Sequence, residues 1–180
     1  MKKLIIALLL SSAALMLTGC ATVAPKPADV LAEGDVRLSG RLSVQVAGSS
    51  GRASGGNAGF ELLGNPRAGM LELSTPLGSL VARATWSPND TTLQTPEAER
   101  SFADMDALTR ELLGEAIPVA ALFDWLRGRP WPQVQSAPLT EGLGFSQLGW
   151  QIDLANLQDG LIVATRKAEP TITLRARVEP

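Results

Sequence analysis

Apolar and polar residues alternate along much of this chain, and this pattern limits its fold more than any other feature of the sequence. Between residues 36 and 46 valine and leucine fall on one face, whereas arginine, serine and glutamine fall on the other. A period of two predicts a long β-strand with one dry face and one wet face. Further strands are expected at 58–63, 69–74, 79–86, 91–95, 150–154, 160–167 and 171–178, and the glycine-rich stretch 48–59 is expected to be a flexible connection.

The middle of the chain changes to a helical period. In "DMDALTRELLG", residues Met105, Leu108 and Leu112 share one face, and Gly114 provides a stop. In "PVAALFDWLRG", Pro118 suits the first turn, and Gly128 follows the apolar stripe that consists of Val119, Leu122, Phe123 and Leu126. Strands, two helices and further strands, joined by short turns, predict an antiparallel meander with helices across its dry face, an α+β fold. Alternation alone leaves open whether that face encloses a filled core or a cavity.

The N-terminus has the pattern of an export signal. Lys2 and Lys3 precede an apolar run that is short for a membrane span, and "LTGC" (17–20) follows it. This ending resembles the lipobox of bacterial lipoproteins, which implies cleavage before Cys20 and attachment of lipid to that cysteine. We therefore expect a signal peptide at 1–19, a lipidated cysteine and tether at 20–33, and one domain at 34–180.

Composition narrows the chemistry of the domain. Removing residues 1–19 leaves 180 − 19 = 161 residues, and removing their two lysines changes the net charge from −2 to −2 − 2 = −4. Such a charge does not favour nucleic-acid binding. Cys20 is the only cysteine, so an internal disulfide cannot form.

Groups suited to catalysis are scarce. The chain contains no histidine, so neither a Ser–His nor a Cys–His pair can exist, and no phosphate-binding Gly-Lys loop is present. Asp104, Asp106 and Glu111 form the nearest approach to a carboxylate cluster, and we interpret them as the solvated face of a helix. We expect no catalytic residue, no metal site and no cofactor, and therefore a binding protein.

One apolar residue stands where a surface turn is expected. In "STPLGS" (74–79), Pro76 and Gly78 predict a turn between two strands, and Leu77 lies between them. An isolated exposed leucine is ordinary, so the turn alone does not assign it a role.

Several motifs together resemble one family. They are the lipobox, "GRLSV" (40–44), "STPLGS" (74–79), "AIPVAALFDWLRG" (116–128) and "FSQLGWQIDL" (145–154). In this order and spacing they resemble the LolB family of outer-membrane lipoprotein receptors. The resemblance implies a strongly curved antiparallel sheet, an incomplete β-barrel, with helices covering its open mouth and an apolar cavity between them.

The resemblance also implies a function. Such a receptor accepts lipoproteins from the periplasmic carrier LolA, holds their acyl chains in the cavity and inserts them into the outer membrane. Pro76, Leu77 and Gly78 match the family's membrane-contacting loop. The expected lining of the cavity and its lid consists of Leu42, Val44, Leu108, Leu112, Leu122, Trp125, Leu126 and Trp150. We expect a lipid-anchored monomer on the periplasmic face of the outer membrane, in contact with lipid through Cys20 and Leu77.

Other interpretations stay open at this stage. On the residues alone, the apolar stripes of the helices suit an ordinary filled core better than a cavity wall. An envelope lipoprotein that binds a different lipid would share the cavity but lack a carrier partner. A structural envelope lipoprotein would have a solid interior and would use Leu77 in a protein interface.

Overall fold

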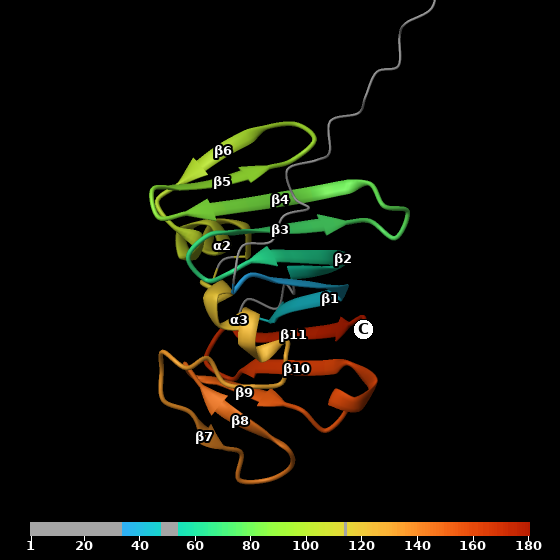
Figure 1. Cartoon of the computed structure of the whole chain (residues 1–180), viewed down its shortest axis with the longest axis vertical. Helices are drawn as coiled ribbons and strands as arrows, with labels where there is room; N and C mark the ends of the chain where they lie inside the picture. The colour runs from blue at the N-terminus through green and yellow to red at the C-terminus, as the bar shows by residue number, and fades with distance from the viewer. Residues whose placement is uncertain (1–33, 48–53, 114) are drawn as a thin grey trace, which may run out of the picture. The chain divides into compact units, whose positions relative to one another are not determined.

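The computed structural model describes residues 34–47, 54–113 and 115–180, which form one antiparallel sheet with two helices (Figure 1). The predicted signal peptide, Cys20 and the tether lie outside the described residues. Within the described part of the chain, neither helix is long and apolar enough to cross a bilayer.

The sheet has eleven strands in the order β6-β5-β4-β3-β2-β1-β11-β10-β9-β8-β7. The first half of the chain supplies β1 (Val36–Ala47), β2 (Ser54–Gly64), β3 (Gly69–Ser74), β4 (Leu80–Ser87), β5 (Asp90–Gln94) and β6 (Glu99–Phe102). The second half supplies β7 (Ala137–Pro138), β8 (Gly144–Gln147), β9 (Trp150–Asp153), β10 (Leu161–Arg166) and β11 (Thr171–Val178), with the 3₁₀ turn η2 (Leu157–Asp159) before β10. Each half is a meander, as the short turns predict.

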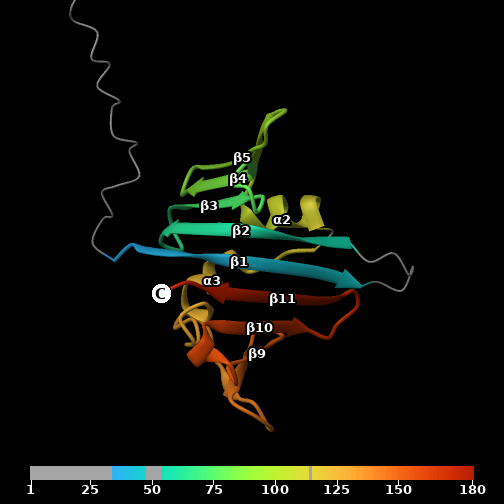
Figure 2. The same cartoon turned by 90° about the vertical axis from the view of Figure 1, so that its right-hand side faces the viewer.

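The two meanders join where the first strand pairs with the last. β1 and β11 lie side by side in both views (Figures 1 and 2), and their register runs from Gly40 opposite Val178 to Ala47 opposite Thr171. Gly40 has φ +155°, and a Cβ atom there would lie 1.9 Å from the backbone oxygen of Arg177. Only glycine allows this approach of the two backbones. β6 and β7 are the ends of the strand order, so the sheet is open, and the predicted open antiparallel sheet with two helices is confirmed.

The chain between β6 and β7 contains α2 (Met105–Leu113) and α3 (Val119–Trp125). Asp104 begins α2, because its Oδ1 accepts a hydrogen bond from the backbone N–H of Ala107 at 2.7 Å. α3 is buried on nearly every side, including Asp124, rather than along a single stripe. Asp124 compensates for its burial through an ion pair with Arg129 at 2.6 Å.

The sequence prediction missed parts of the sheet. β2 begins at Ser54, so residues 54–59 of the predicted flexible connection belong to a strand and pair with β1, while 48–53 lie outside the described residues. Ladder hydrogen bonds use backbone groups, so glycines can take part without any side-chain signal. β6, β7 and β8 were also not predicted, since they span only two to four residues each.

A buried glutamine connects α3, the chain after it and the second meander. The indole N–H of Trp125 and the backbone N–H of Trp131 donate to Gln147 Oε1 at 2.8 and 2.9 Å. Gln147 Nε2 donates to the backbone oxygens of Trp131 and Val134 at 2.8 and 2.7 Å. Its side-chain amide is therefore fully satisfied, and it fixes α3 against β8.

Replacing Gln147 by leucine should destabilise the domain. The change leaves two N–H groups and two carbonyl oxygens without their partner, and we expect the free energy of unfolding in urea to fall by about 3 kcal/mol. Gln151→Leu, the same substitution at an exposed position of β9, should change it by less than about 0.5 kcal/mol. Equal effects of the two substitutions would contradict this role of Gln147.

Candidate functional site

An apolar pocket of about 250 Å³ lies between the helices and the first meander. Its floor comes from β1 to β5 and β11, and its other wall comes from α2, α3 and the connection between them. Among the described residues that line it, only Asn57 and Thr109 carry polar side chains. The pocket therefore suits hydrocarbon and offers few groups to a polar ligand.

Small side chains create this space. Gly56, Ala58, Ala82 and Ala84 stand on the floor of the pocket, at positions where the alternation points inward. In the second meander most inward positions carry bulky residues instead, Ala164 and Ala176 excepted, and α3 packs on this half of the sheet. The packed core includes Phe123, Trp125, Trp150, Ile152, Ile162 and Ile172. One half of the dry face is thus filled, and the other half is partly hollow.

The two helices are held to different degrees. Six of the seven residues of α3 are buried, whereas in α2 only Leu108 and Thr109 are. Leu108 packs in a small separate cluster with Ala84 and Leu93. Thr109 Oγ1 accepts a hydrogen bond from the backbone N–H of Ile117 at 3.0 Å, which fixes the connection between the helices. The opposite face of α2 is exposed, and Leu112, at 49% exposure, stands at the rim of the pocket.

The structure brings five of the eight predicted cavity residues to this pocket. Leu42, Val44, Leu108, Leu112 and Leu122 line it. The other three, which are Trp125, Leu126 and Trp150, belong to the packed core and are not among the lining residues. Trp125 and Trp150 pack on each other with ring centroids 6.0 Å apart, and the guanidinium group of Arg166 lies over the ring of Trp150.

Most residues on the floor of the pocket were not among the predicted cavity residues. The residues concerned include Leu71 and Leu73 of β3, Ala82 and Ala84 of β4 and Leu93 of β5. The alternation in "GMLEL" and "LVARATW" already placed the residues of β3 and β4 on one face, but nothing in the sequence related that face to α2.

The turn between β3 and β4 holds Leu77 out from the protein. Thr75 N–H donates to the backbone oxygen of Ser79 at 2.8 Å, and Gly78 N–H donates to that of Thr75 at 2.9 Å. Gly78 adopts φ +82°, which a residue with a side chain rarely adopts. Leu77 is 95% exposed, the highest value among the exposed large apolar residues that the structure describes. The turn is visible at the right-hand end of β3 in Figure 1.

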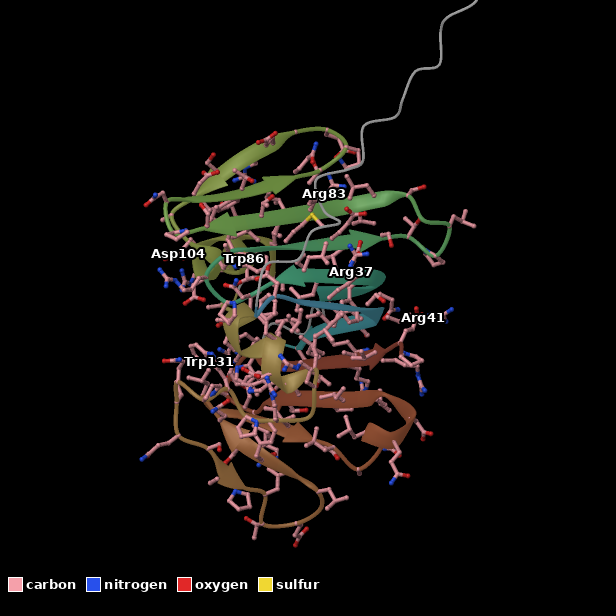
Figure 3. All side chains as sticks on the ribbon, in the orientation of Figure 1. Arg37, Arg41, Arg83, Trp86, Asp104 and Trp131 are labelled. Carbon is pink, nitrogen blue, oxygen red and sulfur yellow. The ribbon has the colours of Figure 1, made fainter. Side chains whose placement is uncertain are left out.

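Two of the three carboxylates considered as a catalytic cluster have structural partners. Asp104, labelled in Figure 3, caps α2, and Glu111 pairs with Arg100. No group of three carboxylate, cysteine or histidine side chains that suits a metal ion occurs in the part of the chain that the structure describes.

Comparisons with known proteins agree with these features. The family model described as "Outer membrane lipoprotein LolB" matches residues 35–176. The chain is 38% identical over 160 residues to the outer-membrane lipoprotein LolB of Bordetella petrii, covering 84% of this chain and 80% of that protein. It is 35% identical over 148 residues to that of Chromobacterium violaceum (80% and 79% covered) and 32% identical over 181 residues to that of Cupriavidus metallidurans (97% and 86% covered).

The open sheet, the apolar pocket and these relatives indicate an outer-membrane lipoprotein with a receptor role. The chain belongs to the LolB family of outer-membrane lipoproteins. Membership supports a general role in lipoprotein localisation at the outer membrane. The family resemblance that the sequence motifs indicated is thereby confirmed.

The pocket predicts binding of an apolar fluorescent probe that fatty acid displaces. Ala82→Phe puts a ring into the pocket and should weaken this binding about tenfold, as expected for the loss of roughly 1.4 kcal/mol. Ala155→Phe, at an exposed position after β9, is the matched control and should leave the dissociation constant unchanged. Probe binding that is insensitive to Ala82→Phe would place the probe elsewhere.

Proposed function

We propose that this protein is an outer-membrane receptor that accepts lipoproteins from a LolA-like periplasmic carrier, shelters their acyl chains and passes them into the membrane. The observation that carries the proposal is the apolar pocket between α2 and the first meander, in a chain of the LolB family. Acyl chains in water cost about 0.8 kcal/mol for each CH₂ group, so a cargo of this kind needs a dry site at every step.

The resting pocket is smaller than such a cargo requires. Sites for small molecules usually measure roughly 300–1,000 Å³, whereas this pocket has about 250 Å³. We therefore propose that α2 moves outward when the chains enter. The weak burial of α2 and the firm burial of α3 support a division in which α2 is the lid and α3 its fixed support.

Release then depends on relative affinity. No nucleotide-binding motif occurs in the sequence, so we propose transfer down a gradient, from a weakly binding carrier to this receptor and then to the bilayer. A pocket lined almost entirely by aliphatic side chains supports this scheme, because it offers hydrocarbon no specific interaction that the bilayer lacks.

Leu77 is proposed to enter lipid at the release step. Burying one leucine side chain contributes roughly 1.5–3 kcal/mol, which is too little to anchor a domain but enough to disturb a lipid surface locally. The anchor is proposed to be the lipidated Cys20, which holds the domain at the periplasmic face of the outer membrane as a monomer.

The direct experiment mixes the lipidated full chain with carrier loaded with lipoprotein and asks whether cargo moves without added energy. Transfer supports the proposal. Probe binding in the pocket without transfer favours a lipoprotein that binds another lipid. Failure of both favours a structural envelope lipoprotein.

Leu77→Glu should separate the two steps of the pathway. We expect cargo uptake from the carrier to stay at the wild-type level and insertion into vesicles to fall about tenfold, because a carboxylate resists entry into hydrocarbon. Leu143→Glu serves as the control, since Leu143 is also exposed, at 68%, but lies in the turn before β8. An equal loss of uptake and insertion in Leu77→Glu would show that the turn has another task.

A further inference from the structure

We propose that three arginines beside the Leu77 turn bind the phosphate groups of anionic phospholipids and set the domain on the membrane with Leu77 facing it. This inference rests on the proposed function, because it assigns the surface that contacts the bilayer. The arginines are Arg41 of β1 and Arg175 and Arg177 of β11, all exposed.

Strand register puts these residues and the turn on one face of the sheet. Ser74, which precedes the turn, pairs with Gly59, Gly59 pairs with Arg41, and Arg41 pairs with Arg177. Neighbouring strands are about 4.8 Å apart, so this row spans roughly 15 Å. Figure 3 shows Arg41 on the same side of the molecule as the turn between β3 and β4.

The row borders a trough of about 840 Å³ on this outer face. Arg41, Arg175 and Arg177 line it together with Pro76 and Gly78 of the turn, and Gly59 between them contributes no side chain. The trough is therefore continuous from the arginines to the base of the loop that carries Leu77. Leu161 of β10, opposite Arg177, adds apolar surface to the lining of the trough beside the arginines.

These arginines differ from most others in the domain. The guanidinium groups of Arg37, Arg83, Arg100, Arg127, Arg129 and Arg166 each lie within 4.0 Å of a carboxylate. Arg37 and Arg83 lie on the same outer face and are neutralised there by Glu61 and Glu72. For Arg41, Arg175 and Arg177, the described residues provide no such ion pair, although Glu179 also lines the trough.

Folding does not explain the arrangement. Arg41 and Arg177 are directly opposite each other, and like charges in such a cross-strand pair destabilise a sheet. Arg177 Nη1 donates to the backbone oxygen of Asp159 at 2.9 Å, which holds its side chain while its other N–H groups remain for a ligand. A fork of N–H donors matches the oxygens of a phosphate group.

An anionic membrane fits this surface better than an acidic protein. The cationic groups are adjacent to a protruding leucine, so a single partner must offer both anionic groups for the arginines and hydrocarbon for the leucine. A phospholipid layer offers both. The domain is net acidic, so an anionic surface repels it unless a local cation cluster faces that surface. Basic residues near such a surface each add to binding, and salt weakens the effect.

The test uses the lipidated full chain with Ser79→Cys labelled by bimane, reconstituted in vesicles that contain lipids brominated on their acyl chains. Quenching reports how far the turn enters hydrocarbon. We expect about threefold stronger quenching in equal parts of phosphatidylcholine and phosphatidylglycerol than in phosphatidylcholine alone. High NaCl concentration should remove the difference.

Two triple variants, which each remove three positive charges, distinguish an effect of where the charges lie from an effect of net charge. Arg41→Gln/Arg175→Gln/Arg177→Gln should lose the phosphatidylglycerol-dependent quenching, and the corresponding triple lysine variant should keep it. Arg67→Gln/Arg110→Gln/Lys167→Gln, at exposed positions elsewhere, should behave like the parent. Retained quenching in the first variant, or equal loss in the last, overturns the inference.

The cargo assay distinguishes this inference from the proposed function. If the arginine-to-glutamine variant keeps its lipid-dependent quenching but no longer accepts cargo from the carrier, the surface binds an acidic protein and the inference is wrong. If the unsubstituted protein accepts no cargo while quenching still depends on the three arginines, the proposed function is wrong. The inference that these arginines bind anionic phospholipid is then upheld.

Discussion

The pairing of the first strand with the last holds this structure together. β1 and β11 are the only link in the described sheet between a meander built from the first half of the chain and one built from the second. Closing such a long stretch of chain costs conformational entropy, and the long ladder between the two strands offsets it. Gly40 lets the two backbones approach closely. Both the apolar pocket and the trough beside the arginines include residues of β1 and β11, so both depend on this pairing.

The two halves use the same sheet differently because their inward side chains differ in size. Isoleucine, tryptophan and leucine fill the second meander and hold α3 in place through packing and through Gln147. Alanine and glycine on the first meander leave a space that α2 closes incompletely. A firmly packed region therefore supports a loosely packed one, which suits the proposed uptake and release of acyl chains.

More of the fold than of the candidate site could be predicted from the sequence. Alternation in β1 is readable because each inward residue reports directly on burial, whereas glycines 55 and 56 pair through backbone alone and give no such signal. β8 escaped prediction because it has only four residues, and because the turn after it contains Leu148 with φ +54°, a conformation that leucine seldom adopts. Leu77 was readable because its exposure depends on its immediate neighbours. Which leucines line the pocket depends on Ala82 and Ala84, which are distant along the chain, so Leu42 and Leu126 look alike in sequence.

An unclosed sheet leaves two rims of unpaired backbone, and such rims invite strands of other molecules to add on. Here β7 has only two residues and ends in Pro138, which lacks an N–H, and β6 carries Glu99 and Arg100 on a strand of four residues. Both rims are thus poor templates for growth. Neighbouring copies at the outer membrane can therefore keep their apolar pockets accessible without joining through their edge strands into fibres.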